Sequence, residues 1–342
     1  MKSDLNRENL KICVVIFVYN RTRFIKDALE SILAQTFEKR NTEIILITNC
    51  ELLLLDNYIR NYNIKLIRSQ GTLGDYLYLA LTQTSADIIS FLDDDDLFFH
   101  NKLEYLNREF MNDPKLVFLH NNYTIYRQGN LEIPRSKMTS RIKVELDGPI
   151  SLRIFKKLVY NRIDFNMSCI TIRRSAAIWA LDAIRKIKAW PDTVLFLVSL
   201  NYRGNLILDN LILTAYRVHS DNISSLISSK NPGTFISKIK KNYELRVETC
   251  NLIMGCFNDK IITNFLTERM AVWNSTLFII DQKKGLREVL YKTKQLFLGS
   301  IRIKSSSIVI IFLLLIYILR PSFSKLIYYK LMFNQIKKNR IS

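Results

Sequence analysis

Residues 12–121 alternate between two patterns of hydrophobic spacing. Continuous apolar runs rich in β-branched residues predict strands that are buried on both faces. Those strands are Ile12–Tyr19, Glu43–Ile47, Lys65–Ile67, Asp87–Leu92 and Leu116–Asn121. Apolar residues spaced three and four apart predict helices between them, at Arg23–Thr36, Glu51–Tyr62, Asp75–Thr82 and Lys102–Met111. Strands joined by crossover helices form a parallel sheet covered on both faces, so the pattern predicts an α/β fold.

The rest of the chain is less regular. Residues 128–151 are polar and basic and predict a long loop, and Leu206–His219 predicts two short strands or a strand and a turn. A strand is expected at Asn166–Arg173 and helices at Ser175–Ile187, capped by Ser175, and at Asp192–Tyr202. From Phe235 to about Gly299 the pattern is mostly helical. We therefore expect a first domain over residues 10–228, a helical extension over 229–300 and a tail over 301–342.

The charge of the chain is concentrated in that tail. The whole chain has 50 Lys and Arg against 31 Asp and Glu, a net charge of +19, which implies an acidic partner such as nucleic acid, anionic lipid or a phosphorylated substrate. From Lys283 onward there are 13 Lys and Arg and one acid. Ile308–Leu319 is an unbroken apolar run, and the basic, aromatic segment Lys325–Lys338 suits the headgroup layer of an anionic membrane. The tail is predicted to span or lie on a membrane; the alternative is a buried helix packed on the first domain.

The cysteines and the N-terminal segment indicate the compartment. The five cysteines are an odd number without a CxxC pair, which argues against a zinc site and a secreted disulfide framework. Met1–Leu10 is polar and has no secretory h-region. We expect the first domain to lie at the cytoplasmic face of a membrane.

Four adjacent aspartates, Asp93–Asp96, directly follow a predicted buried strand. Ligands of parallel sheets bind beyond the carboxyl ends of the strands. Side chains alternate along an extended segment, so Asp93 and Asp95 are expected to face one way and Asp94 and Asp96 the other. Two carboxylates on one side can hold Mg²⁺ or Mn²⁺ together with substrate phosphates. The alternative is a solvated acidic turn that caps the next helix.

Three segments in this order resemble family 2 glycosyltransferases, which have the GT-A fold. They are Val14–Phe37 with its Tyr-Asn turn, Ser85–Leu106 around an Asp-x-Asp motif, and Tyr216–Ser225. The resemblance covers about residues 10–225. It implies a Rossmann-like, mainly parallel sheet flanked by helices, and a hexosyltransferase that uses a nucleotide-sugar donor.

The resemblance also implies roles for individual residues on the donor side. Asp93, with Asp94 beside it, would contact the donor, and Asp95 would ligate the metal. Val18, Tyr19 and Asn20 would lie against the nucleotide base. Gly71 and Asp75 stand where the next donor-side loop is expected, and His219 is either a further metal or diphosphate contact or a structural histidine.

Two departures from the family pattern bear on the donor base and the catalytic base. Thr48 and Asn49 stand where many relatives have Asp-Asp or Asp-Asn, so donors other than uridine nucleotides remain open. Asp192 resembles the general base of inverting members, although Pro191 stands where the family often has Glu. The alternative is that Asp192 caps its helix. The expected reaction is an inverting transfer to a glycan or lipid-linked acceptor, in surface-glycan, lipid-linked oligosaccharide or protein glycosylation.

Other classes of protein remain as alternatives. A nucleic-acid-binding protein would use the positive charge, but no nucleic-acid module is recognisable and nucleic acid is not the expected partner. A dinucleotide oxidoreductase is disfavoured because no GxGxxG follows the first strand. A donor-binding protein without catalysis stays open.

Overall fold

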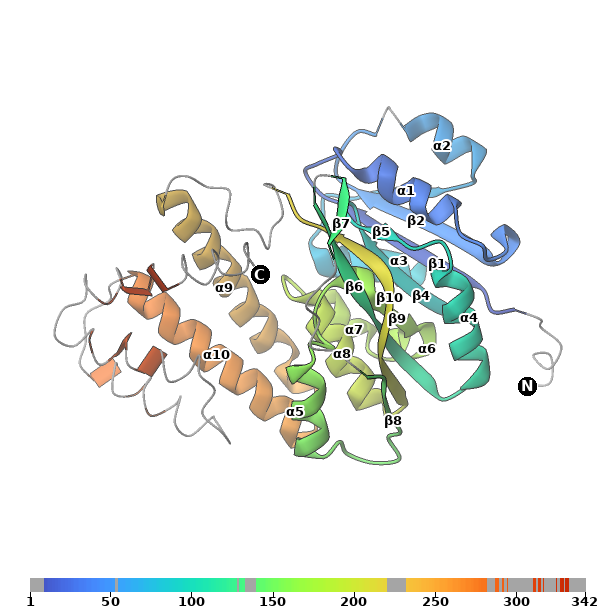
Figure 1. Ribbon diagram of the computed structural model, residues 1–342. Coiled ribbons are helices and arrows are strands. Elements are labelled where there is room, and N and C mark those ends of the chain that lie inside the picture. The colour runs from blue at the N-terminus through green and yellow to red at the C-terminus, as the bar shows by residue number, and fades with distance from the viewer. Residues whose placement is uncertain are drawn as a thin grey trace. The chain divides into compact units, whose positions relative to one another are not determined.

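The structure is a computed structural model that describes residues 9–52, 55–127, 129–132, 140–219 and 232–281, with scattered positions from 287 to 331. It divides into two compact units, Met1–His219 and Ser220–Ser342. The described strands of the first unit are β1 (Ile12–Val18), β2 (Thr42–Thr48), β3 (Lys65–Arg68), β4 (Ile88–Asp93), β5 (Leu97–Phe98), β6 (Leu116–Arg127), β7 (Asn130–Glu132), β8 (Ile142–Val144), β9 (Ile170–Arg173) and β10 (Asn205–Arg217). They form one sheet in the order β3-β2-β1-β4-β9-β6-β10-β5, with β7 on β6 and β8 on β10 (Figure 1).

The first four strands of this order are parallel and in close register. Val18 at the end of β1 lies opposite Thr48 at the end of β2, and Phe17 lies opposite Asp93 at the end of β4. Strands β1 and β4 are almost wholly buried, as expected for apolar runs without alternation, whereas β3 at the edge of the sheet is partly exposed. The loops that follow β1, β2 and β4 therefore meet at one edge of the sheet.

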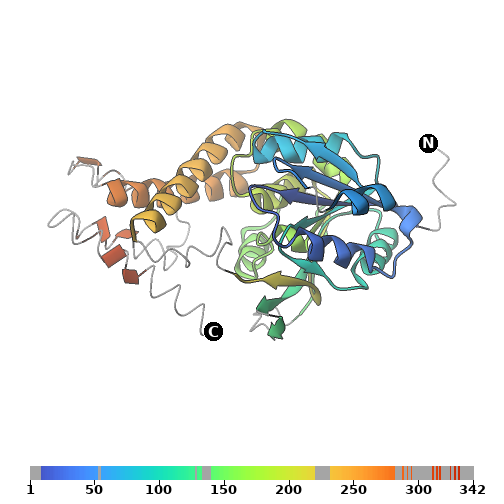
Figure 2. The ribbon, with the colours of Figure 1, turned by 90° about the horizontal axis from the view of Figure 1, so that it is seen from above.

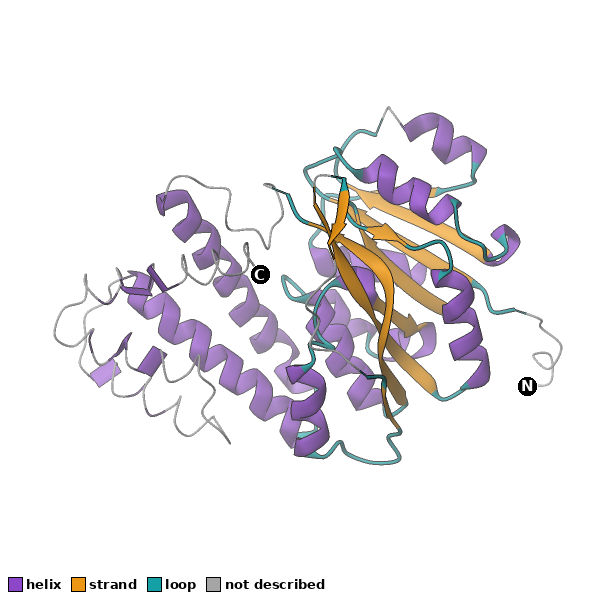
Figure 3. Cartoon of the chain, in the orientation of Figure 1, coloured by secondary structure: helices purple, strands orange, loops and turns teal. Residues whose placement is uncertain are grey.

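Two layers of helices cover the sheet (Figures 2 and 3). α1 (Ile25–Leu33) and α4 (Lys102–Asn112) share a buried core with one face of β1, β2 and β4, and α2 (Asp56–Asn61) packs at its margin. On the other face, α3 (Leu73–Thr82) contacts α6 (Arg174–Trp179) and α7 (Leu181–Arg185), and α6 contacts α8 (Pro191–Tyr202). The predicted α/β architecture is confirmed.

The second half of the unit departs from the predicted pattern. β9 runs antiparallel between β4 and β6, so the sheet is mixed. β10 is one long strand, β8 lies within the predicted loop, and α5 (Leu152–Tyr160) was not predicted. The helix expected over Ser175–Ile187 is split into α6 and α7, and the N-cap of α6 is Arg173 without a capping side chain. The strands differ because tertiary pairing, rather than local periodicity, decides where they form: β9 and β10 pair with β6, and β8 pairs with β10.

Gly74 allows α3 to approach the end of α7. Its backbone N–H donates to the Ile187 carbonyl at 2.9 Å, and a Cβ at this position would lie 2.3 Å from the Arg185 carbonyl oxygen. Gly74→Ala should therefore destabilise the protein by about 1–3 kcal/mol, since this backbone clash outweighs the helix propensity of alanine. Urea unfolding measures the change. Gly148→Ala is the matched control because nothing lies within 4 Å of its Cβ; equal stability of the two variants would contradict the close approach.

His120 on β6 is buried, and its Nε2 lies 2.6 Å from the Phe165 carbonyl oxygen, while Nδ1 is buried without a hydrogen-bond partner. Burial lowers the pKa of His120 from 6.5 to about 4. Between those values the unfolded chain binds a proton that the folded chain does not, so stability is present above pH 6.5 and is lost as the pH falls toward 4.

We expect the wild type to lose roughly 3 kcal/mol more unfolding free energy than His120→Gln between pH 7 and pH 4. Comparing the two proteins removes the contribution of other titrating groups. Urea unfolding at several pH values checks this, and parallel pH profiles of the two proteins would contradict it.

The second unit contains α9 (Pro232–Ile253) and α10 (Lys260–Asp281), which pack against each other. Described positions of the apolar tail join their core: Ile310, Ile311, Leu313 and Leu314 are buried with residues of α9 and α10. The rest of Ile308–Leu319, and most of Lys325–Lys338, lies outside the described residues. Among the helices that the structure describes, none is long and apolar enough to cross a membrane.

Candidate active site

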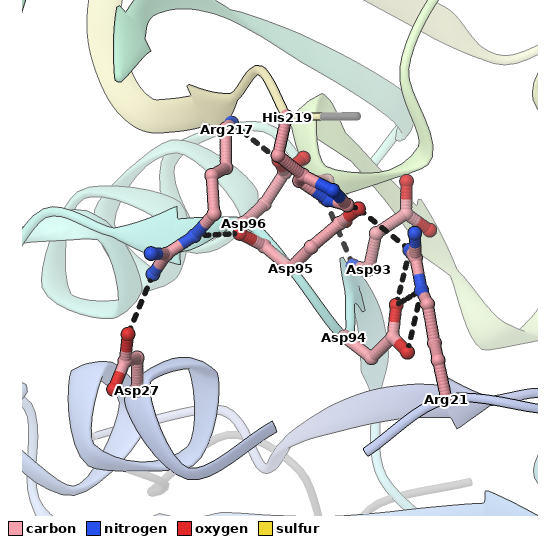
Figure 4. A network of polar contacts seen from close by, with 9 residues as sticks. Arg21, Asp27, Asp93, Asp94, Asp95, Asp96, Arg217 and His219 are labelled. Atoms are coloured by element: carbon pink, nitrogen blue, oxygen red, sulfur yellow. Dashed lines mark hydrogen bonds and ion pairs between the residues drawn. The ribbon is translucent and has the colours of Figure 1, made fainter. Parts of the chain in front are cut away.

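The acidic run forms a turn rather than a continued strand. β4 ends at Asp93, and the Asp96 N–H donates to the Asp93 carbonyl at 3.2 Å. The alternation expected for an extended segment is therefore wrong beyond Asp93. The turn places oxygens of Asp93, Asp95 and Asp96 within 4.8 Å of one another, whereas Asp94 points to a different partner (Figure 4).

Arg217 at the end of β10 fixes the backbone of this turn. Its N–H donates to Asp96 Oδ1 at 2.9 Å, its Nε donates to the Asp95 carbonyl at 2.7 Å, and its Nη2 lies 2.8 Å from Asp27 Oδ2 on α1 (Figure 4). The guanidinium carbon lies 4.4 Å from the centre of the Phe24 ring. Arg217 thus joins the acidic turn to α1 and β10.

Asp94 and Asp95 contact further positive or polar groups. Arg21, in the loop after β1, donates through Nε to both carboxylate oxygens of Asp94 at 3.0 Å. Its Nη2 lies 2.6 Å from Asp95 Oδ2, and His219 Nε2 lies 2.9 Å from the same oxygen. His219 therefore contacts Asp95 from a different segment of the chain.

The carboxylates of the turn fit a divalent cation. Asp96 is fully buried, and its Oδ2 has no hydrogen-bond partner. Burial and the charge of Asp95 raise the pKa of Asp96 to about 7, and burial with the neighbouring carboxylates raises the pKa of Asp93 well above its usual range. A cation bound among these oxygens would remove their mutual repulsion and satisfy Asp96 Oδ2. Mg²⁺ or Mn²⁺ suits an all-oxygen set of this kind.

The loops after β1 and β2 form the expected donor side. Tyr19 is 55% exposed, and Asn20 has a left-handed φ of 56°. The Asn20 N–H donates to Asn49 Oδ1 at 3.0 Å, and Asn49 Nδ2 donates back to Asn20 Oδ1 at 2.8 Å. Tyr19, Asn20 and Asn49 therefore lie together, at the same edge of the sheet as the acidic turn.

Two residues assigned to the donor side are buried instead. Val18 and Thr48 are both 0% exposed. The Thr48 hydroxyl accepts a hydrogen bond from the Cys50 N–H at 2.9 Å, so it stabilises the loop after β2. Of the Thr48–Asn49 pair, the structure leaves Asn49 as the partly exposed member.

Asp75 is a helix cap. The α3 helix begins at Leu73, two residues earlier than predicted, and Thr72 and Asp75 form a capping box. The Thr72 N–H donates to Asp75 Oδ2 at 2.9 Å, and this bond is the main cause of the lowered pKa of Asp75. A Cβ on Gly71 would lie 2.7 Å from the Asp75 Cβ. Gly71 and Asp75 thus shape the start of α3. This structural role explains the presence of both residues here without any contact to a ligand.

Asp192 lies in the first turn of α8 and is linked to the acidic turn. The helix N-cap is Trp190, with a left-handed φ of 69°, so Asp192 is not the N-cap residue. Its Oδ2 accepts a hydrogen bond from the Asn166 N–H at 3.3 Å. Asn166 Oδ1 accepts from the Ser168 N–H at 2.8 Å, and Ser168 Oγ accepts from the Asp93 N–H at 2.9 Å. Three hydrogen bonds therefore connect the candidate base to the start of the acidic turn.

Comparisons with known proteins give the family of this domain. Residues 13–180 match the model of "Glycosyl transferase family 2". Residues 13–180 therefore belong to this family. The match includes the acidic turn and ends before Asp192 and His219.

Similar proteins carry related names. The chain is 37% identical over 122 residues to an uncharacterized glycosyltransferase of Rickettsia bellii, covering 33% of this chain and 17% of that protein. It is 26% identical over 111 residues to the poly(ribitol-phosphate) beta-N-acetylglucosaminyltransferase TarS of Staphylococcus aureus, covering 30% of this chain and 18% of that protein. These alignments span less than a fifth of the relatives' own length.

Solved structures confirm the fold over a larger part of the chain. The structure of S. aureus TarS 1–349 in complex with UDP-GlcNAc has a TM-score of 0.56 at 15% identity, covering 96% of this chain and 92% of that one. GalNAc-T7 with UDP, GalNAc and Mn²⁺ has a TM-score of 0.51 at 13% identity, covering 78% of this chain and 51% of that one. At these identities the likeness shows the fold alone. The mixed sheet and its helices make up a GT-A-like fold.

Several residues of the candidate site were not nominated from the sequence. Arg21 and Arg217 stand inside the Tyr-Asn segment and the Tyr216–Ser225 segment, so their position next to site residues is the signal that could have indicated them. Lys102 likewise stands inside the Ser85–Leu106 segment, whereas Asn166 and Ser168 carry no such signal. Lys102 is fully buried, its Nζ donates to the Ser168 carbonyl at 2.6 Å, and burial lowers its pKa to about 7.

Proposed function

We propose that this family 2 glycosyltransferase is a metal-dependent, inverting hexosyltransferase that takes its sugar from a nucleotide-sugar donor. The observation that carries the proposal is the group of carboxylates from Asp93, Asp95 and Asp96 at the carboxyl end of β4, with Asp96 Oδ2 buried and unpartnered. These residues would hold Mg²⁺ or Mn²⁺, with His219 beside Asp95. When bound, the cation neutralises negative charge on the departing nucleoside diphosphate.

The other groups of the site would bind and orient the donor. Tyr19 offers an exposed aromatic face to the nucleotide base, and the Asn20–Asn49 pair offers uncharged hydrogen-bonding groups beside it. TarS has been solved with UDP and with UDP-GlcNAc. Because this chain has Thr48 where many relatives have the first Asp of the pair, both uridine and guanosine donors belong in a test.

Asp192 would act as the general base. Hydrogen bonds from the backbone N–H groups of Asn166 and Thr193 to its two oxygens orient the carboxylate. It would take the proton of an acceptor hydroxyl, which attacks the anomeric carbon opposite the leaving diphosphate. One such displacement inverts the anomeric configuration. We propose a glycan or lipid-linked acceptor, within surface-glycan, lipid-linked oligosaccharide or protein glycosylation.

The test is a screen of UDP- and GDP-sugars with Mn²⁺ or Mg²⁺, measuring release of the nucleoside diphosphate. We expect release that is abolished by EDTA and restored by the metal. Proton NMR of the product would give the anomeric configuration, and retention would contradict the single displacement. A purified, folded protein that neither binds nor turns over any donor would overturn the proposed function.

We also propose that the basic C-terminal region lies on an anionic membrane at its cytoplasmic face. The support is its sequence: 13 Lys and Arg against one acid from Lys283 onward. Because Ile310, Ile311, Leu313 and Leu314 are buried with α9 and α10, we favour surface contact by the basic side chains over a spanning segment.

The full chain should therefore co-sediment with phosphatidylglycerol vesicles and not with phosphatidylcholine vesicles. We expect binding to fall by most of its amplitude between 0.05 and 0.5 M NaCl, where the Debye length drops several-fold to about 4 Å. Sedimentation that is insensitive to salt, or equal for both lipids, would contradict an electrostatic surface contact.

A further inference from the structure

Arg21 is placed so that one guanidinium joins two residues of the acidic turn. Its Nε donates to Asp94 and its Nη2 lies 2.6 Å from Asp95 Oδ2 (Figure 4). The side chains of Asp94 and Asp95 are 6% and 5% exposed, so these ion pairs are largely shielded from water. A planar fork that binds a carboxylate through two N–H groups is held more firmly than a lysine would be.

This contact falls on the carboxylate that the proposed metal would use. Asp95 is a member of the oxygen cluster with Asp93 and Asp96, and its Oδ2 already contacts both Arg21 and His219. A divalent cation that coordinates Asp95 therefore meets a positive charge on the same carboxyl group. Since a guanidinium is not deprotonated in proteins, this opposing charge is permanent.

The other buried cations near the turn do not have this geometry. Arg217 contacts the main-chain carbonyl of Asp95 and the carboxylate of Asp27, so it fixes the backbone of the turn. Lys102 donates to the Ser168 carbonyl and the Thr214 hydroxyl. Among the ion pairs of the described residues, those of Arg21 reach the Asp94 and Asp95 carboxylates directly.

We propose that Arg21 is a positioning residue that makes metal binding depend on the donor. This inference rests on the proposed metal-dependent function. In the donor-free protein Arg21 neutralises Asp94 and Asp95, and it lowers the affinity of the turn for a free divalent cation. A nucleoside diphosphate brings its own negative charge, which allows the cation and the guanidinium to be held together. Metal and nucleotide then bind with positive cooperativity, each raising the affinity for the other.

The experiment measures Mn²⁺ binding to the full chain without any donor, by electron paramagnetic resonance of free Mn²⁺. Removing the charge in Arg21→Gln should tighten donor-free Mn²⁺ binding by about 5–150-fold, the range of typical coupling energies. Adding UDP or GDP, whichever binds the wild type, should then raise Mn²⁺ affinity less in the variant. Arg23→Gln is the matched control: it makes the same charge change two residues away, where the guanidinium lies 4.8 Å from the Phe24 ring centre.

The outcomes separate this inference from the function on which it rests. Equal Mn²⁺ affinity of wild type and Arg21→Gln overturns the role of Arg21 and leaves the metal site standing. Absence of Mn²⁺ binding to every variant, with and without nucleotide, overturns metal dependence itself. Arg21→Met replaces Arg21→Gln if the latter does not fold, as judged by thermal unfolding, and must show the same tightening.

Discussion

Replacing Asp192 with Asn is expected to lower kcat by about 10²–10⁴-fold while donor affinity stays close to that of the wild type. The amide cannot accept the proton of the acceptor hydroxyl. The amide oxygen can still accept one of the hydrogen bonds that Asn166 and Thr193 donate to the carboxylate. The first turn of α8 should therefore keep its conformation. Transfer is measured with a saturating donor, and donor binding is measured separately by calorimetry.

The control for this substitution is Asp182→Asn. Asp182 also lies in the first turn of a helix, α7, and is exposed. It should leave kcat unchanged, which separates the loss of a base from the loss of an acidic residue near a helix start. If Asp192→Asn transfers sugar as fast as the wild type, Asp192 is not the base.

Replacing Asp95 with Asn is expected to weaken Mn²⁺ binding and to lower kcat/KM by about 10²–10³-fold, similar to the loss of one strong transition-state contact. The change removes one charge from the oxygen cluster with Asp93 and Asp96. It also takes an anionic partner from His219 and one of the two anionic partners from Arg21. Residual turnover should respond less to EDTA than wild-type turnover does. Metal titration of activity and direct Mn²⁺ binding are both required.

The loss of activity in Asp95→Asn must be larger than the loss caused by the same Asp-to-Asn change at a residue near the acidic turn but outside the oxygen cluster. Asp27→Asn is the comparison, because Asp27 is half exposed and contacts Arg217 rather than the cluster. We expect less than a few-fold change for Asp27→Asn, since Asp27 is half exposed and the asparagine oxygen can still accept a hydrogen bond from Arg217. Wild-type metal affinity in Asp95→Asn would contradict a role for Asp95 as a ligand.

The first half of the fold was predictable because its signals are local. Buried parallel strands require continuous apolar runs, and β1, β2 and β4 formed close to where those runs stand. The second half was less predictable. β9 is a short strand placed by antiparallel pairing with β4 and β6, and β10 continues through a polar stretch because β6 pairs along most of its length. Periodicity carries no information about such long-range partners.

The candidate site divides in the same way. The Asp93–Asp96 run, Asp192 and His219 could be nominated from residue type and motif order. The turn after Asp93 could not, because strand alternation ends where the Asp96 N–H bonds back to the Asp93 carbonyl. The burial of Thr48 is also a tertiary result, whereas the capping box of Asp75 could have been predicted from the Thr72-x-x-Asp75 spacing.

The sequence by itself determined an α/β domain of family 2 glycosyltransferase type with acidic residues at the end of a buried strand, because apolar runs and chemical motifs are properties of neighbouring residues. Only the tertiary structure decided which carboxylates converge. It grouped Asp96 with Asp93 and Asp95, and it bound Asp94 to Arg21. The reason is physical: crowded buried carboxylates are arranged by the cations and N–H groups that compensate their charge. Here those groups come from Arg21 and Arg217, which are distant from the turn in sequence.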